Sequence, residues 1–191
     1  VVIDGNENFG GDDLSIGTTS IDGIQVLTPG STADSGTVEF YTGGFVTFHG
    51  PTLAFRELGA LGTVEFFDTI EVDDLIYNGT AGNDVFTVNP GEVVLLNSQI
   101  PVTAESIVFL TLRGFDGDDV FNVNNGHAIS VVNLEGGGPS ASDVANLTGN
   151  GGDLSISIGS LDGRATVQGG GLGTVNLSGV ELANIDANDG D

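Results

Sequence analysis

Apolar and polar residues alternate in short runs along the chain, and many of these runs follow a turn rich in glycine and acidic residues. Residues 85–88 read VFTV and residues 120–123 read VFNV, each directly after such a turn. Alternation with a period of two, carried by Val, Ile and Phe, is typical of half-buried β-strands. No amphipathic helical stripe bounded by caps is found. The pattern therefore predicts an all-β protein.

The turns recur at similar intervals. The glycines that close them, Gly10, Gly44, Gly82, Gly117, Gly152 and Gly190, are 34, 38, 35, 35 and 38 residues apart. Each interval holds two further strand-like runs, and three strands with three turns make up one coil of a parallel β-helix. We therefore expect one right-handed β-solenoid of about five coils over 1–191, the hand following the general preference of β-crossovers. Its units are approximately 10–43, 44–81, 82–116, 117–151 and 152–189.

Stacked coils would form an internal column from the apolar residue four places beyond each of the first five glycines. The column would contain Leu14, Phe48, Phe86, Phe121 and Ile156, with rungs about 4.8 Å apart. The ends of the chain resemble each other and show no polar cap. We therefore interpret the chain as a fragment of a longer repetitive protein.

A longer repeat leaves a second fold open. Residues 61–72 resemble 172–182, and residues 30–40 resemble 138–147, with offsets near 108. A repeat of that length is also the size of an immunoglobulin-like β-sandwich, so tandem sandwiches are the alternative. The solenoid is favoured because the short period accounts for the long one.

The charge of the chain excludes two classes of partner. It has 27 acidic residues, three Arg and no Lys, which gives a net charge of −24. A nucleic-acid binder, or a protein that binds anionic membranes, needs a basic surface that this composition cannot supply. No apolar run is long enough to span a bilayer as a helix, and the absence of Cys excludes disulfides and thiolate metal sites. The charge favours metal cations as partners, or a protein that is kept soluble by repulsion between its copies.

Two turns resemble a known calcium motif. Residues 79–87 (GTAGNDVFT) and 114–122 (GFDGDDVFN) are similar to the nonapeptide G-G-x-G-x-D-x-U-x of repeats-in-toxin (hemolysin-type) proteins. The matching positions are Gly79, Gly82, Asp84 and Phe86, and likewise Gly114, Gly117, Asp119 and Phe121. Residues 8–16 match more weakly. The resemblance, which extends to tandem-repeat surface proteins of bacteria, implies secretion, calcium-assisted folding and a structural or adhesive role.

The resemblance has a limit. In the family the nonapeptides run in tandem, whereas this chain has one motif per unit of about 35 residues, and Thr80 and Phe115 replace the second glycine. The calcium geometry of the family therefore cannot be transferred whole.

Electrostatics also favours calcium. Stacked coils would place Asp84 beside Asp119, and two carboxylates about 4 Å apart repel by roughly 4 kcal/mol at an effective dielectric of 20. Exposed carboxylates are ionised near pH 7, so a hard cation that prefers oxygen ligands is the expected relief. The alternative is that these aspartates only accept hydrogen bonds from turn amides. The candidate metal ligands are Asp12, Asp13, Asn83, Asp84, Asp116, Asp118, Asp119 and Asp153.

Catalytic signals are weak. No G-x-S-x-G or H-E-x-x-H motif is present, and the two histidines, His49 and His127, lie near strand ends or turns. A β-helix polysaccharide lyase would need Lys or Arg to hold an acidic sugar. A glycoside hydrolase needs only a carboxylate pair, so it is the less favoured alternative. The aromatic-rich stretch 40–67 predicts core packing, or a face that stacks on carbohydrate.

The sequence therefore favours a structural or adhesive repeat segment, stabilised by calcium, of an extracellular or cell-surface protein. Its expected partners are copies of itself or adjacent repeats stacked end to end, as in a stalk, surface layer or filament, and surface glycans. A glycan-binding adhesin module is the alternative. Three N-x-S/T sequons, at Asn78, Asn146 and Asn176, are compatible with an extracellular location.

Overall fold

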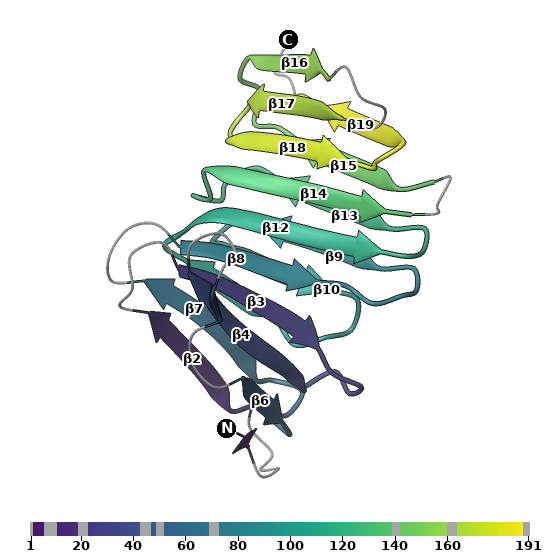
Figure 1. Ribbon diagram of the computed structural model, residues 1–191. Coiled ribbons are helices and arrows are strands. Elements are labelled where there is room, and N and C mark those ends of the chain that lie inside the picture. The colour runs from purple at the N-terminus through teal and green to yellow at the C-terminus, as the bar shows by residue number, and fades with distance from the viewer. Residues whose placement is uncertain are drawn as a thin grey trace.

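The computed structural model describes residues 2–5, 11–18, 23–42, 47–48, 52–68, 73–138, 142–159 and 164–188. This described part of the chain contains 19 strands and no helix, and the strands form two sheets (Figure 1). The prediction of an all-β protein is confirmed. No helix in the described ranges is long and apolar enough to cross a membrane.

Sheet A is the larger of the two sheets. Its strands, in spatial order, are β1 (Val2–Asp4), β6 (Leu53–Arg56), β4 (Gly36–Thr42), β3 (Gly23–Pro29), β8 (Asp73–Asn78), β12 (Ile107–Phe115), β14 (Val131–Gly137), β18 (Thr174–Ser178), β17 (Ala165–Gly169) and β16 (Leu154–Ile158). The short β5 (Thr47–Phe48) pairs with β4.

Sheet B lies behind sheet A in Figure 1. Its strands, in spatial order, are β19 (Leu182–Asp186), β15 (Val144–Thr148), β13 (Val120–Asn124), β9 (Val85–Asn89), β10 (Val93–Leu96), β11 (Val102–Glu105), β7 (Thr63–Asp68) and β2 (Asp13–Thr18). Across the two sheets, most strand pairs are parallel. The antiparallel pairs come from hairpins, such as β10 with its neighbours β9 and β11.

From β8 onward the chain passes from sheet A to sheet B four times, from β8 to β9, β12 to β13, β14 to β15 and β18 to β19. Corresponding residues on sheet B pair in register: Phe86 with Phe121, Phe121 with Ala145, and Ala145 with Ala183. These positions are 35, 24 and 38 residues apart. A circuit from one sheet to the other and back, without a hairpin, therefore takes 24 residues. The hairpin strands β10–β11 and β16–β17 lengthen the other two circuits to the spacing that the sequence shows.

The predicted internal column is correct for only one pair. Phe86 and Phe121 are neighbours, with ring centroids 5.4 Å apart and planes inclined by 3°. Leu14 instead pairs with Val64 in sheet B. Ile156 lies in β16 of sheet A and is 55% exposed. The error has a physical reason: the turn at Gly152 opens an inserted hairpin of sheet A, so it is not equivalent to the turn at Gly117.

The alternative of tandem immunoglobulin-like sandwiches is wrong. β12 pairs in parallel with β8 on one side and with β14 on the other. Immunoglobulin sheets are antiparallel and each module closes its own core. Here one cluster of buried side chains runs between the sheets, from Leu14 near one end to Val180 near the other.

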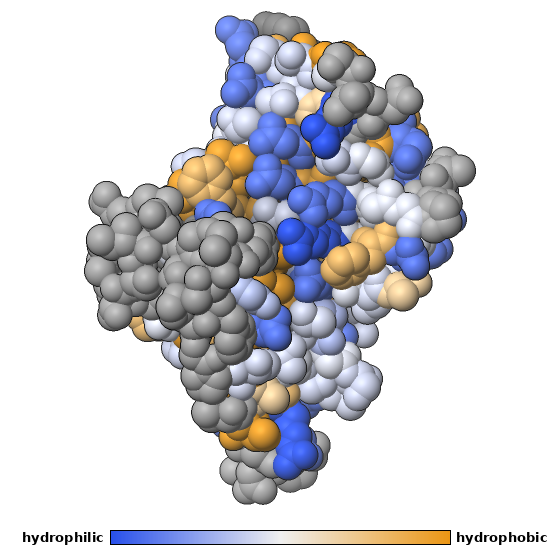
Figure 2. Space-filling model, viewed as in Figure 1, coloured by the Kyte–Doolittle hydropathy of each residue, from blue (hydrophilic) through white to orange (hydrophobic). Residues whose placement is uncertain are grey.

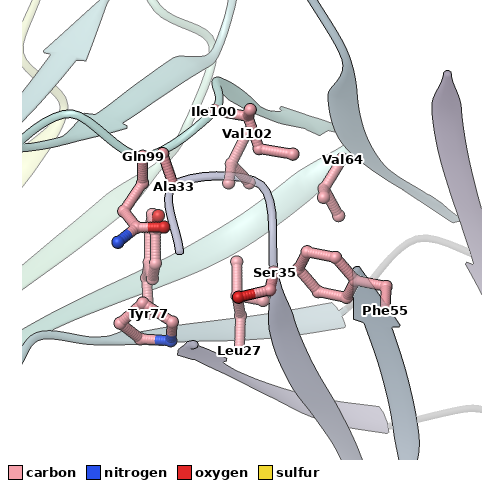
Figure 3. Close-up of a pocket in the computed structure, with 10 residues that line it drawn as sticks. Leu27, Ala33, Ser35, Phe55, Val64, Tyr77, Gln99, Ile100 and Val102 are labelled. Atoms are coloured by element: carbon pink, nitrogen blue, oxygen red, sulfur yellow. The ribbon is translucent and has the colours of Figure 1, made fainter. Parts of the chain in front are cut away.

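The core is filled by inward-facing side chains of both sheets. Figure 3 shows a cavity in it, between the N-terminal strands and the loop before β11, near Tyr77, Phe55 and Gln99. Its volume is about 10 Å³, room for one water molecule. This cavity is too small for an organic ligand, so candidate chemistry is sought at the corners and on the outer faces.

Candidate functional site

One corner of the stack carries a column of acidic residues, where strands of sheet A end and strands of sheet B begin. Each acid lies two residues before the first inward-facing residue of its sheet B strand. The members of this acid ladder are Asp84, Asp119, Asp143 and Glu181. Because the strands pair in register, the four acids lie on successive circuits.

Backbone amides join the acids to one another. The N–H of Asp84 donates to Oδ1 of Asp119, that of Asp119 to Oδ1 of Asp143, and that of Asp143 to Oε2 of Glu181, each over 2.8 Å. The strand hydrogen bonds continue beside them, with Val120 N–H donating to the Asp84 carbonyl over 2.8 Å. The carboxylates of Asp119, Asp143 and Glu181 therefore each tie their own circuit to the preceding one.

The first acid of the ladder also closes its own turn. Oδ2 of Asp84 accepts the Thr80 N–H over 2.6 Å, and Oδ1 accepts the Asn97 side-chain amide over 2.5 Å. This is the hydrogen-bonding role that the sequence left open as the alternative to calcium. It also explains the motif glycines by packing: a Cβ on Gly79 would lie 2.5 Å from Asp84 Oδ2, and one on Gly114 would lie 1.9 Å from Asp119 Oδ2.

Three of the four ladder acids are buried and Glu181 is exposed, which the sequence did not predict. Asp84, Asp119 and Asp143 have no exposed surface. Burial raises the pKa of Asp119 to about 6, against the opposing effect of the Asp84 N–H, and the neighbouring charges of Asp143, Asp84 and Asp118 raise it further. The expectation that the stacked carboxylates of Asp84 and Asp119 are exposed is therefore wrong, and burial raises the pKa of Asp119.

One oxygen of the ladder stands out. Oδ2 of Asp119 is buried and has no hydrogen-bond partner. It borders the same small space as the carbonyl oxygen of Gly136, because a Cβ on Gly114 would lie 1.9 Å from the first and 2.7 Å from the second. Two acceptors that share a space without a donor favour a proton or a cation between them.

Calcium fits this corner in ligand type but not in ligand number. Carboxylate and carbonyl oxygens are its preferred ligands, yet Ca²⁺ takes about six to eight of them. The part of the chain that the structure describes contains no group of three or more acidic or His side chains placed to hold a metal ion. Side chains of the described residues alone do not form a calcium cage, and calcium binding stays a prediction.

The other predicted ligands lie in three separate places. Asp12 and Asp13 are at the start of β2, where Asp13 accepts a hydrogen bond from Thr63. In the exposed turn before β13, the Asp118 N–H donates to the Asn83 side chain over 3.0 Å, and Asp116 is nearby in the sequence. Asp153 is exposed before β16, in the inserted hairpin. The structure therefore brings together Asn83, Asp84, Asp118 and Asp119, and leaves the other residues apart.

Sequence reasoning missed Asp143 and Glu181, because neither follows a glycine turn of the expected spacing. A different signal marks them. The segments DVFTV (84–88), DVFNV (119–123), DVANL (143–147) and ELANI (181–185) share an acid, a branched apolar residue and then alternation. Aligning these strand starts, instead of the glycines, would have identified the ladder.

The outer faces carry amide ladders. On sheet B, Asn184 donates to Asn146 and Asn146 to Asn122, each over 2.9 Å. On sheet A, Asn176 donates to Asn133 over 3.0 Å. Two of the three sequon asparagines, Asn146 and Asn176, thus have side chains engaged in hydrogen bonds between strands.

The histidine and aromatic candidates are mostly structural. His127 is 9% exposed, burial lowers its pKa, and neither ring nitrogen has a hydrogen-bond partner among the described residues. Phe55 and Phe66 are buried in the core, as predicted for the aromatic-rich stretch. His49, Phe45 and the side chain of Phe48 lie outside the described residues.

An open groove crosses the outer face of sheet A at β14, β17 and β18, in the polar region over these strands in Figure 2. Its volume is about 350 Å³, and its polar side chains include Asn133, Glu135, Arg164 and Asn176. Among the described residues that line it, Glu135 is the single acid, and it forms an ion pair with Arg113 over 2.8 Å. The described residues of this groove therefore do not supply the carboxylate pair of a glycoside hydrolase.

No protein-family model, no curated protein and no solved structure matches this chain. The resemblance to repeats-in-toxin proteins rests on the two nonapeptides alone and stays a prediction.

Proposed function

We propose that the chain is a structural segment of a secreted or cell-surface protein, one that extends or spaces other parts by stacking β-circuits. The observation that supports this proposal best is the set of bonds between circuits. The acid ladder at the corner and the asparagine ladders on both faces link the circuits in addition to the sheet hydrogen bonds. In this proposal each circuit is one coil of a right-handed parallel β-solenoid, and calcium adds to its stability.

The edges of the sheets support end-to-end assembly with copies of the chain or with adjacent repeats. Among the described strands, β1 and β2 at one end and β16 and β19 at the other have a neighbour on one side only. The free side of an edge strand offers N–H and C=O groups that pair with another strand. Each hairpin adds two antiparallel pairings, which together restore the strand direction. All four edge strands therefore run in the same direction as the strands of their own sheet that pair in parallel.

Small-angle X-ray scattering of the chain and of a tandem fusion of two copies tests the spacer role. A spacer predicts an elongated particle whose longest dimension nearly doubles in the fusion, without a flexible joint. A fusion that scatters as two beads on a linker contradicts the proposal. Specific binding on a glycan array, or hydrolysis of any glycan in a panel, would instead favour the adhesin or hydrolase alternatives.

A further inference from the structure

The two sheets end at different levels at the C-terminal end of the stack. Sheet A continues beyond β18 through β17 and β16, whereas sheet B stops at β19. β16, the uppermost strand in Figure 1, is hydrogen-bonded to β17 alone among the described strands. Val167 of β17 is fully buried, but its neighbours in β16 are not: Ile156 is 55% exposed and Ile158 is 77% exposed. Among the described residues, no strand of sheet B therefore covers the inward face of β16.

The last three strands of sheet A at this end, β16, β17 and β18, carry no charged residue, whereas Asp153, Arg164 and Glu181 flank strands of this end and Asp186 lies in β19. Residues 154–159 and 165–180 contain no Asp, Glu, Lys or Arg, in a chain whose net charge is −24. Strongly like-charged copies repel over most of their surface, so they approach most easily where charge is lacking. Natural edge strands are generally protected by a charge, a proline or a bulge. β16, with the sequence LSISI, has no charged residue and no proline.

The directions of the strands that border the uncovered space determine which strand can fill it. The chain reverses between β18 and β19 within residues 179–181, so neighbouring strands of sheets A and B run in opposite directions. β16 has the direction of β18, because two antiparallel steps separate them. A two-fold rotation about an axis parallel to the strands exchanges the two sheets. It thereby brings β16 of one copy antiparallel to the free edge of β19 of another.

We propose that two copies of the chain join at their C-terminal ends in a two-fold dimer. In this dimer β16 of each copy extends sheet B of its partner beyond β19, and the Ile156 and Ile158 side chains of both copies face each other between the sheets. Such an interface is self-complementary, as two-fold dimers require. It covers the exposed isoleucines and pairs the free edges of β16 and β19 in one step.

The inference deepens the proposed function, since it specifies how one end of the segment meets another copy. It also limits growth at that end, because a two-fold contact closes after two copies, whereas head-to-tail stacking continues. A monomeric rod would overturn the dimer and leave the spacer role intact. Glycan hydrolysis by a dimer would overturn the spacer role and leave the dimer intact.

Sedimentation and light scattering, at micromolar to near-millimolar protein with the charge screened by salt, test the dimer. The expected limiting mass is twice the 19.3 kDa of the chain. Ile158→Lys introduces a charge into the interface and should weaken association at least about tenfold. The matched control is Leu61→Lys, because Leu61 is 76% exposed and lies before β7, in the N-terminal half. It should leave the mass unchanged. A monomer under all conditions, growth beyond two copies, or equal weakening by Leu61→Lys would overturn the inference.

Cross-linking provides a second readout that does not depend on the Lys variant folding. The chain has no Cys, so a single introduced Cys can bridge two copies only near a symmetry axis. Ile156→Cys, in the middle of β16, should give a dimer joined by a short bifunctional thiol cross-linker, since facing sheets lie about 10 Å apart and a direct disulfide does not span that distance. Val85→Cys, on the outer face of β9 and 44% exposed, should remain a monomer. Equal cross-linking of the two variants would overturn the two-fold contact.

Discussion

At the scale of single residues, carboxylates of this protein are buried where residues of the adjacent circuit offer backbone N–H groups. Asp119 receives the Asp84 N–H on one oxygen, and its other oxygen shares a space with the Gly136 carbonyl. A neutral carboxylic acid satisfies both sides, because its O–H can donate to that carbonyl. The raised pKa of Asp119, to about 6, has the same physical basis.

We predict that Asp119→Asn removes part of the pH dependence of stability. The pKa of Asp119 is higher in the folded state, about 6, than the value near 3.9 of an unfolded chain. Its contribution is therefore fully present below about pH 4 and is lost as the pH rises through about 6. The loss amounts to about 3 kcal/mol. An asparagine keeps the acceptor and supplies a permanent donor, so the variant should be the more stable protein at pH 8.

Urea denaturation of both proteins from pH 4 to pH 8, in the presence of a chelator, measures this difference. Comparing the two proteins at each pH cancels the contributions of the other carboxylates, which titrate in both. A variant that is less stable than the parent at pH 8, by the same amount at every pH, would show that Asp119 is ionised in the folded state.

At the scale of elements, the turns at the corner determine how closely the sheets can join. The end of β12 must pass the Asp119 carboxylate, and Gly114 is the residue at the point of contact. A Cβ added to Gly79 or Gly136 would also lie close to a carboxylate oxygen, at 2.5 and 2.3 Å respectively. The motif glycines thus have a steric role at the acid ladder that does not depend on a metal ion.

Gly114→Ala should therefore destabilise the fold, by about 1–3 kcal/mol as expected for overpacking. The new methyl group would lie 1.9 Å from Asp119 Oδ2 and 2.7 Å from the Gly136 carbonyl, which belongs to the next strand. Gly82→Ala is the matched control in the same family of turns, because its Cβ would meet only the Thr80 hydroxyl at 3.8 Å. Thermal unfolding of the two variants compares them. Similar losses of stability in the two variants would mean that the structure around Gly114 accommodates the methyl group without cost.

At the scale of the whole molecule, the dominant feature is the net charge of −24. Self-repulsion of this size opposes the compact state, and salt screens it. We therefore predict that NaCl raises the melting temperature. Calcium should raise it further at equal ionic strength, since a ligand that binds only the folded state stabilises by about 2.7 kcal/mol at a hundredfold excess over its Kd.

Scanning calorimetry in chelator, NaCl, MgCl₂ and CaCl₂ at matched ionic strength separates screening from binding. Magnesium is the control, because it prefers octahedral sites that keep several water ligands and calcium accepts larger, irregular ones. If calcium and magnesium have the same effect, the calcium prediction made from the two nonapeptides is wrong.

The sequence by itself determined what local chemistry controls. Period-two alternation determined that the chain is all-β, and the repeated turns correctly placed Phe86 beside Phe121 and Asp84 beside Asp119. These features follow from the pleat of a strand and from turn residues, which act over a few positions.

Only the tertiary structure decided which sheet each strand joins. The spacing of glycines treats the turn at Gly152 and the turn at Gly117 alike, yet one opens a hairpin of sheet A and the other begins a strand of sheet B. That difference places Asp143 in the acid ladder, leaves Asp153 outside it and exposes Ile156. Pairing between distant strands depends on long-range packing. A hairpin inserted into a repeat therefore changes the spacing of equivalent positions along the chain, although the later strands β18 and β19 still pair with β14 and β15.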